Sequence, residues 1–329
     1  MSEKRGKGIG LLSGGLDSML AVRVLQEQKL ELMGVTFVTP FFGPKQGLDA
    51  GRTLGIPVRL LDISSVHMDM LKAPVYGYGS QVNPCIDCHA LMLREAGQLM
   101  EQEGGDFLFT GEVLGQRPMS QRRDSLRSVE KLSGYAGRVL RPLSARLLSP
   151  TIVEGEGLVD RERLLNIQGR SRKRQEALAA HYGIVDYPQP GGGCLLTKEG
   201  FARKLKALLS SFPGATPRQA EAIKWGRLFQ LPGGSILVIG RNRGDNEKLE
   251  SSAGEKDVLF RVADHPGPLG LLITASEFQD DLTLAAGLIL AFSDAPPPRP
   301  ASVEWRLGSN GGVLQLIKDE KGRFGKYQV

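Results

Sequence analysis

The sequence predicts an α/β protein: a parallel, doubly wound sheet followed by a smaller α+β domain. In the first half of the chain, short apolar and β-branched runs alternate with segments whose apolar residues recur at helical spacing. Strands separated by helices at this interval form a parallel sheet with helices on both faces. Beyond Pro213 the pattern changes to several strands around one largely buried helix. This change indicates a separate α+β module.

The expected elements can be assigned to two domains, residues 1–200 and 201–329. In the first domain we expect strands at 8–12, 32–38, 58–63 and 107–110, and helices at 17–28, 48–54, 86–103 and 161–182. A Pro- and Gly-rich segment at 186–193 then interrupts regular structure. In the second domain we expect strands at 235–240, 257–262, 270–274 and 313–318, and a helix at 279–292.

The bulk composition is that of an ordinary globular protein. The chain has 329 residues, of which 41% are hydrophobic and 24% charged. It contains no run of 18 apolar residues, so no membrane-spanning helix is expected. Its first residues lack the apolar segment of a signal peptide, and three cysteines are too few for a disulfide framework. We therefore expect a cytoplasmic protein with no membrane partner.

Positive charge is concentrated in one central segment. Between Arg117 and Arg174 there are 14 Lys and Arg against 6 Asp and Glu, a local net charge of +8 in a chain that carries +6. This pattern is typical of a surface where a polyanion docks, although a solvated basic face has the same composition. The side chains expected to meet nucleic-acid phosphates are Arg117, Arg122, Arg123, Arg127, Arg170, Arg172, Lys173 and Arg174.

A glycine loop follows the first expected strand and opens the first helix. Its residues are Ser13, Gly14, Gly15, Leu16, Asp17 and Ser18. Glycines let backbone amides approach an anion closely, and the positive end of the following helix adds to the attraction. Ser13 and Ser18 can donate hydroxyl hydrogen bonds, and Asp17 can hold a Mg²⁺ ion bound to phosphates. The loop has neither the Lys-Ser/Thr pair of a Walker motif nor the third glycine of a dinucleotide fingerprint.

Residues 13–18 resemble the Ser-Gly-Gly-x-Asp-Ser motif of the PP-loop superfamily. The resemblance implies the adenine-nucleotide α-hydrolase-like fold and cleavage of ATP between its α- and β-phosphates, which leaves AMP on the substrate. It also implies ATP and Mg²⁺ as cofactors, with Ser13, Gly14, Gly15, Asp17 and Ser18 at the nucleotide. The alternative is a glycine turn with a polar helix cap.

Two of the cysteines, Cys85 and Cys88, lie about one turn apart at the start of an expected helix, and Cys194 follows three glycines. A helix N-terminus lowers the pKa of a thiol and so favours the thiolate, which binds metals or attacks sulfur. Three interpretations are open: structural zinc completed by His67 or His89, a redox pair with Cys194 as the resolving or persulfide-carrying thiol, or an iron–sulfur cluster on all three cysteines. Such a cluster would leave one iron open to hydrosulfide, and glycines 191–193 would let Cys194 approach the pair.

Two further stretches resemble tRNA-thiolating enzymes. Thr110-Gly111-Glu112-Val113-Leu114-Gly115-Gln116, followed by Ser120-Gln121, is similar to a motif of 4-thiouridine synthetases. Cys85-x-x-Cys88 with Met92 and Arg94, and the segment 139–143, resemble the branch of that family that carries an iron–sulfur cluster, while Asn83-Pro84 before the cysteines is similar to 2-thiouridylases. The resemblance covers about residues 8–200. It implies that Gly111, Glu112 and Gln116, with Gln121, line the nucleotide or base pocket.

The chain also departs from those families. We find neither their N-terminal RNA-binding domain nor a C-terminal rhodanese-like domain. Instead, the segment 238–249 and Asp264-His265-Pro266-Gly267-Pro268 resemble the RNA-binding domain of the NFACT family. This resemblance implies that the second domain binds tRNA, whereas ordinary turn chemistry at Arg241 and His265 is the alternative.

Together these features predict tRNA uridine thiolation, with 4-thiouridine favoured over 2-thiouridine. ATP would adenylate a uracil carbonyl through Asp17 and its loop, and sulfur would displace AMP with the help of a [4Fe-4S] cluster held by Cys85, Cys88 and Cys194. The implied partners are tRNA and a sulfur donor, either sulfide or a cysteine desulfurase, and a homodimer is compatible with this. The alternatives are an amide- or nitrile-forming PP-loop ligase with zinc or no metal at the cysteines, and a non-catalytic RNA-binding factor.

Overall fold

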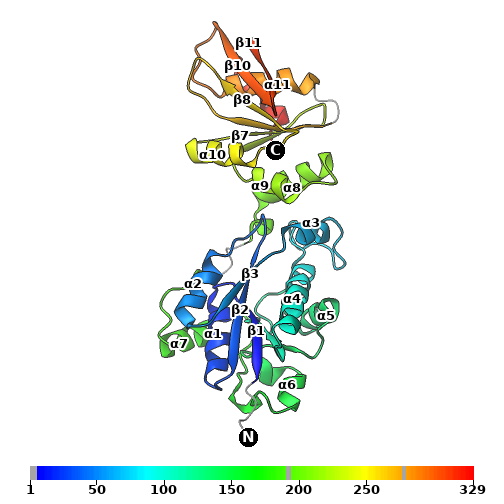
Figure 1. Ribbon diagram of the computed structural model, residues 1–329, viewed down its shortest axis with the longest axis vertical. Coiled ribbons are helices and arrows are strands. Elements are labelled where there is room, and N and C mark those ends of the chain that lie inside the picture. Colours follow the sequence, from blue (N-terminus) through cyan, green and yellow to red (C-terminus); the bar gives the residue numbers. More distant parts are fainter. Residues whose placement is uncertain (1–5, 190–193, 276–278) are drawn as a thin grey trace. The chain divides into compact units, whose positions relative to one another are not determined.

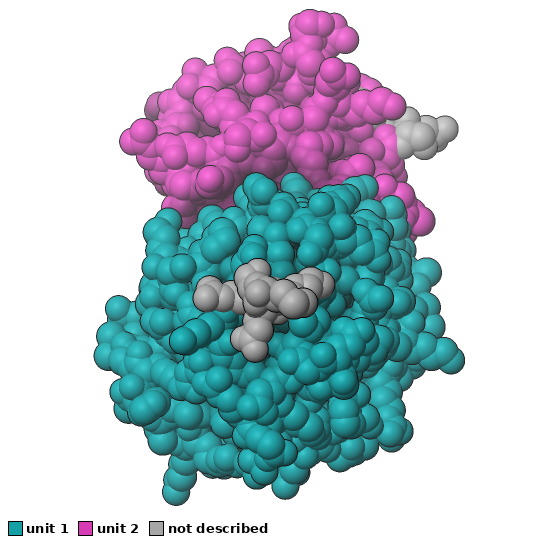
Figure 2. Space-filling model, turned by 60° about the horizontal axis from the view of Figure 1, so that its bottom comes forward, with its two compact units in different colours: residues 1–194 teal, residues 195–329 magenta. Residues whose placement is uncertain are grey.

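The computed structural model describes residues 6–189, 194–275 and 279–329. The chain divides into two compact units, Met1–Cys194 and Leu195–Val329, which Figure 2 distinguishes by colour. The glycines at 191–193, which we expected to let Cys194 approach the other cysteines, lie outside the described residues. We describe each unit by itself.

Unit 1 is built on a parallel five-stranded sheet in the order β3-β2-β1-β4-β5. The strands are β1 (Lys7–Leu11), β2 (Glu31–Val38), β3 (Val58–Asp62), β4 (Phe107–Phe109) and β5 (Val139–Leu140). The α-helices are α1 (Leu16–Gln26), α2 (Lys45–Leu54), α3 (Ser64–Lys72), α4 (Cys85–Gln102), α5 (Arg123–Ser133), α6 (Ile152–Gly155) and α7 (Lys173–His181). The predicted parallel α/β class is confirmed.

Both faces of this sheet are covered, as the apolar strands require. Successive residues of β4 point to opposite faces: Phe107 and Phe109 pack in one core with residues of α1, α2 and α7, and Leu108 packs in the other with residues of α4 and α5. Figure 1 shows α1, α2 and α7 on one side of the sheet and α4 and α5 on the other. The sheet is therefore doubly wound.

Unit 2 is an antiparallel sheet of six strands in the order β11-β10-β8-β9-β7-β6. Its strands are β6 (Arg227–Gln230), β7 (Ile236–Ile239), β8 (Val258–Val262), β9 (Gly270–Ile273), β10 (Pro300–Leu307) and β11 (Asn310–Ile317). Its α-helices are α8 (Glu199–Ser211), α9 (Pro217–Ala222), α10 (Arg243–Ser252) and α11 (Gln279–Ala291). Helix α11 packs on strands β8 to β11, and its buried residues form the core of the unit. Across the described parts of both units, no helix is long and apolar enough to span a membrane.

The structure differs from the sequence prediction at several segments: strands β5, β6 and β10 and helices α3, α5, α6, α8, α9 and α10 were not among the expected elements. The long basic helix expected at 161–182 is wrong: a short 3-10 turn at Arg161–Arg163 is followed by irregular chain up to α7. The backbone amides of Leu165, Ile167 and Gly169 donate instead to carbonyls of Pro142, Leu143 and Leu114, so tertiary pairing replaces helical hydrogen bonds. Strand β10 was missed because Pro296-Pro297-Pro298 directly precedes it.

The close packing of β1 against β4 is testable at Gly10. A Cβ atom at this position would lie 2.1 Å from the ring of Phe109, which is buried. We expect Gly10→Ala to lower the free energy of unfolding by about 1–3 kcal/mol, since overpacking forces neighbouring side chains to move. Denaturant titration followed by circular dichroism measures this.

The matched control for that substitution is Gly155→Ala in α6, where an added Cβ meets nothing within 4 Å. Its stability should equal or slightly exceed that of the wild type, because alanine favours a helix over glycine. Equal midpoints for the two variants would contradict the packing argument.

Candidate nucleotide and cysteine site

The carboxyl ends of β1 and β4 form a topological switch point. From β1 the sheet continues to β2 on one side and to β4 on the other. Open α/β sheets bind ligands in the crevice outside the carboxyl ends of two such strands. The glycine loop follows β1, and the segment 110–116 follows β4. Helix α4 precedes β4 and runs antiparallel to it, so its first residue, Cys85, belongs to the same edge.

The glycine loop is held in shape by its own hydroxyl groups. The Ser18 hydroxyl donates to the Gly15 carbonyl at 2.7 Å and lies 3.4 Å from the Ser13 oxygen, which in turn accepts from the Gly15 amide at 3.3 Å. Gly14 has a φ of +77°, a conformation that side chains with a Cβ rarely adopt. Helix α1 starts directly behind, so the positive end of its dipole faces this loop.

Asp17 has one carboxylate oxygen in use and one without a partner. Its Oδ2 accepts from Gln116 Nε2 at 2.8 Å, and Gln116 Oε1 accepts from Gln175 Nε2 at 3.2 Å. Asp17 Oδ1 is buried and has no hydrogen-bond partner within the described residues. A buried, unpartnered carboxylate oxygen beside a phosphate-type loop fits a Mg²⁺ ligand, because Mg²⁺ is bound through one or two carboxylates and substrate phosphates.

Gly111 brings the segment after β4 against the glycine loop. A Cβ atom at this position would lie 2.4 Å from the backbone nitrogen of Ser18 and 2.5 Å from the carbonyl carbon of Asp17. Only a residue without a side chain allows that approach. The structure thus brings the two predicted motifs together, with Gly111 and Gln116 both touching the Asp17 region.

Glu112 lies beneath this edge in a buried ionic network. One carboxylate oxygen accepts from His89 Nδ1 at 2.8 Å, and the other from Arg141 Nε at 3.1 Å and from the Thr110 hydroxyl at 3.2 Å. Burial by itself would raise the pKa of Glu112, but the Arg141 charge and the His89 hydrogen bond outweigh it and lower that pKa to about 2. Arg141 also pairs with Glu130. Glu112 is therefore ionised, and both of its oxygens are engaged by the protein.

The cysteines lie in one region of unit 1. Cys85 Sγ accepts from Asn83 Nδ2 at 3.2 Å, and Cys88 Sγ lies 3.3 Å from His67 Nε2. Burial, followed by the charges of Cys194 and Cys85, raises the pKa of the Cys88 thiol well above its usual range. The expectation of a lowered thiol pKa is not met at Cys88, because burial and the charges of the neighbouring cysteines raise its pKa.

The histidines near the cysteines have different partners. His67 is buried between Phe41, Phe42 and Cys88, and burial lowers its pKa to about 4, so its ring is neutral near pH 7. His89 pairs with Glu112 instead. No group of three or more His, Cys, Asp and Glu side chains within the described ranges is arranged to hold a metal ion. Cys85 and Cys194 are near enough to Cys88 for their charges to contribute to its raised pKa.

The basic segment provides mostly exposed cations. Of the eight residues expected at nucleic-acid phosphates, Arg172 is half-buried, and the seven exposed are Arg117, Arg122, Arg123, Arg127, Arg170, Lys173 and Arg174. Arg141 contributes to the charge of the segment but is buried in the Glu112 network. Gln175 and Arg141 are site residues that the sequence analysis missed. No motif distinguishes Gln175, and Arg141 was noted only as part of a similar segment.

The chain is similar to one protein family and to several known proteins. A family model described as the NFACT protein RNA binding domain matches residues 226–319. The tRNA-specific 2-thiouridylase MnmA of Trichlorobacter lovleyi is 34% identical over 116 residues, 31% of this chain and 32% of that protein. A probable tRNA sulfurtransferase of Oceanobacillus iheyensis is 27% identical over 147 residues, 42% of this chain and 35% of that protein.

These matches span about a third of the length of each curated relative. Among solved structures, a predicted subunit of a tRNA methyltransferase from Methanocaldococcus jannaschii aligns at 14% identity with a TM-score of 0.34, over 54% of this chain and 76% of that one. The resemblance to tRNA thiouridylases and sulfurtransferases, and that of the second domain to NFACT RNA-binding domains, is confirmed by the sequence matches.

The Glu112 network makes a prediction about acid stability. Glu112→Gln leaves Arg141 buried beside an uncharged partner, and we expect a loss of about 3–5 kcal/mol near pH 7. The folded pKa of Glu112, about 2, lies below its ordinary value of 4.5, so its ionised form stabilises the fold above pH 4.5. That contribution is lost as the pH falls toward 2.

The difference in unfolding free energy between wild type and Glu112→Gln should therefore shrink steadily below pH 4.5. Denaturant titrations at several pH values measure it, and Glu156→Gln, at an exposed position, is the charge-matched control. A gap that stayed constant between pH 7 and pH 3 would show that the Glu112 charge is not what stabilises the fold.

Proposed function

We propose that this protein uses ATP to adenylate a uracil carbonyl in tRNA and then inserts sulfur at the activated carbon. The observation that carries the proposal is the unpartnered, buried Oδ1 of Asp17 in a Ser-Gly-Gly-x-Asp-Ser loop at the switch point of the sheet. A cation ligand and a phosphate-binding loop at one place fit a nucleoside triphosphate. Cysteine thiols at the same edge of the sheet can serve as ligands or carriers for the sulfur that is inserted.

In the first step the loop binds the phosphates, and Asp17 would hold a Mg²⁺ ion, which when bound offsets their charge. The uracil carbonyl oxygen attacks the α-phosphorus, a carbon–oxygen–phosphorus linkage forms, and the bond to the β-phosphate oxygen breaks with release of pyrophosphate. Gln116 keeps the Asp17 carboxylate oriented through the 2.8 Å hydrogen bond to its Oδ2. Gln175 in turn fixes the Gln116 amide, so that Asp17 Oδ1 is left without a protein partner within the described residues and would be available to a cation.

In the second step a sulfur nucleophile displaces AMP from the activated carbon. Cys85, Cys88 and Cys194 would hold a [4Fe-4S] cluster, which when bound offers one iron without a protein ligand as a place for hydrosulfide. Asn83 positions Cys85 through its amide, and the neutral His67 ring lies 3.3 Å from the sulfur of Cys88. Because a metal ligand must be a thiolate, Cys88 would lose its proton when such a group binds.

RNA binding is proposed for both units. Residues 226–319 match an RNA-binding domain, and the exposed arginines of unit 1 can neutralise backbone phosphates. Exposed cations that meet phosphates release counterions, so tRNA affinity should fall steeply between about 50 and 200 mM salt. We favour 4-thiouridine as the product because the segment 110–121 resembles 4-thiouridine synthetases.

Asp17→Asn tests the first step. With one charge removed from the proposed Mg²⁺ ligand, we expect tRNA-dependent pyrophosphate release to fall on the order of a hundredfold or more. Asp49→Asn on α2, a half-buried residue that pairs with Lys45 and Arg52, removes the same charge and should retain wild-type release. Equal rates in the two variants would remove Asp17 from the reaction.

The cysteines should affect only the second step. We expect Cys85→Ser and Cys194→Ser to release pyrophosphate at near wild-type rates but to form no thiouridine, since adenylation does not need a thiol. Mass spectrometry of tRNA nucleosides measures the product and separates 4-thiouridine from 2-thiouridine. Loss of pyrophosphate release in both variants would contradict the assignment of the cysteines to sulfur insertion alone.

One contact favours a second candidate. The 3.3 Å approach of His67 to Cys88 suits a structural zinc site of three cysteines and one histidine, as in an amide- or nitrile-forming ligase with the same ATP loop. Metal analysis after anaerobic purification distinguishes the two: iron with labile sulfide supports thiolation, and one zinc per chain supports the ligase.

A further inference from the structure

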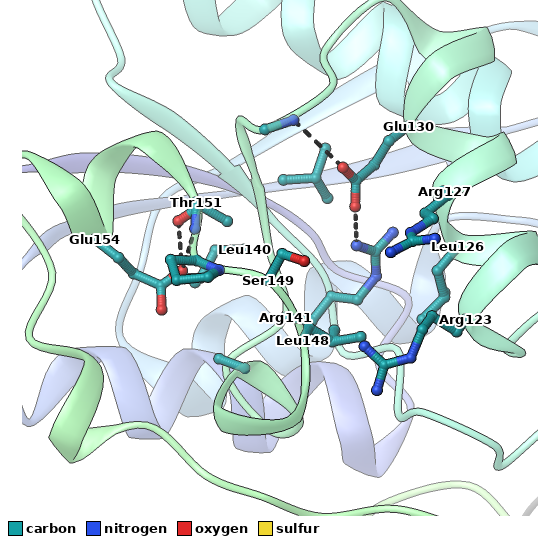
Figure 3. A pocket seen from close by; sticks show the side chains of 14 residues that line it. Arg123, Leu126, Arg127, Glu130, Leu140, Arg141, Leu148, Ser149, Thr151 and Glu154 are labelled. Carbon is teal, nitrogen blue, oxygen red and sulfur yellow. Dashed lines mark hydrogen bonds and ion pairs between the residues drawn. The ribbon is translucent and has the colours of Figure 1, made fainter.

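A pocket at the β5 edge of unit 1 gathers three arginines away from the glycine loop. Its volume is about 230 Å³, several times the roughly 30 Å³ that a water molecule occupies. Residues of α5, β5 and the segment 145–154 line it. Figure 3 shows the side chains of Arg123, Arg127 and Arg141 from one close view, together with Ser149.

The acidic residues of this pocket are already engaged. Glu130 pairs with Arg141 Nη1 through one oxygen and accepts from the Gly137 amide at 3.3 Å through the other. Glu154 accepts from Arg161 at 2.5 Å and from the amide and hydroxyl of Thr151 at 2.7 Å. Neither carboxylate therefore has an oxygen without a partner with which to attract a cation into the pocket.

In contrast, some guanidinium donors of the pocket arginines have no hydrogen-bond partner within the described residues. Arg141 is 3% exposed, and its Nη2 has no hydrogen-bond partner within the described residues, although a buried guanidinium normally satisfies its donors. Arg127 is exposed, and the described residues offer it neither an ion pair nor a hydrogen bond. Arg123 uses one nitrogen on the Leu147 carbonyl at 2.8 Å. A pocket with spare guanidinium donors and occupied carboxylates selects an anion.

We propose that this pocket binds a phosphate oxyanion, and that its source is the backbone of the RNA substrate. Arginine suits phosphate because its planar donors match the oxygens of that group. The pocket lies within the basic segment, where Arg122 and Arg123 are exposed. The choice of RNA over a free phosphate compound rests on the proposed function.

The network behind the pocket gives this site a positioning role. Arg141 lines the pocket and donates to Glu112 through Nε, and Glu112 holds His89, the neighbour of Cys88. Phosphate contacts fix the register of a nucleic acid without reading its sequence. A phosphate held here is thus placed relative to the cysteine helix through two successive contacts.

The test compares Arg127→Gln with Lys131→Gln. Both residues lie exposed on α5 and lose one positive charge, but only Arg127 lines the pocket. We expect Arg127→Gln to weaken binding of tRNA about tenfold, equivalent to one charge-assisted hydrogen bond, and to reduce the slope of log K against log salt by about 1. Lys131→Gln should change affinity less than twofold. Fluorescence anisotropy without ATP measures both.

A second titration, with inorganic phosphate in a calorimeter, identifies the source of the anion. If Arg127→Gln loses phosphate binding and also weakens tRNA binding, the RNA assignment stands. If it loses phosphate binding while tRNA binding matches that of Lys131→Gln, the RNA source is overturned and a small phosphate compound takes its place. If neither ligand distinguishes the two variants, the oxyanion site itself is overturned.

These outcomes are independent of the reaction. Both titrations are made without ATP, and neither reads pyrophosphate or thiouridine. A wild-type protein that binds phosphate in the pocket but releases no pyrophosphate with any tRNA would refute the proposed function and leave the oxyanion site intact.

Discussion

The buried pair of Glu112 and Arg141 is the interaction on which the candidate site depends. It joins the end of β4 to β5, and its further contacts reach α4 through His89 and α5 through Glu130. A buried ion pair adds little net stability, because desolvation offsets much of the attraction. Its effect is positional: the loss of Glu112 would leave the buried Arg141 with Glu130 alone, and the loss of Arg141 would leave the Glu112 carboxylate with His89 and Thr110, so the two motifs keep one relative placement.

A second set of hydrogen bonds, separate from the Glu112 network, fixes the glycine loop through Asp17. Asp17, Gln116 and Gln175 form a line of hydrogen bonds from α1, through the segment after β4, to α7. Gln175 is fully buried, which ties the start of the basic helix α7 to the carboxylate proposed to hold Mg²⁺. Local hydrogen bonds and parallel strand order together place chemically active groups that are far apart in sequence at one edge of the sheet.

Elements that depend on a local sequence pattern could be predicted from the sequence. Elements that depend on hydrogen bonds between distant segments could not. The strands around β1 and the glycine loop were correctly predicted because their apolar runs and turn residues are contiguous. The helix expected at 161–182 was wrong because its amides bond to carbonyls of residues 114, 142 and 143. Likewise, nothing near Arg141 in the sequence indicates that it neutralises Glu112, some thirty residues away.

The raised pKa of Cys88 bears on which sulfur chemistry the site can support. Burial and neighbouring thiolates both oppose the ionised form of Cys88, and the nearby His67 is neutral and supplies no positive charge. With its pKa raised, the Cys88 thiol keeps its proton near pH 7 unless a positive charge is brought to it. A metal group bound there would supply that charge and deprotonate its ligands, whereas a persulfide route would use Cys194, the thiol expected to carry the persulfide, because a protonated Cys88 is a weak nucleophile. Both proposed routes must therefore deal with the Cys88 proton: a bound metal group would remove it, and a persulfide route would leave it in place and use another thiol.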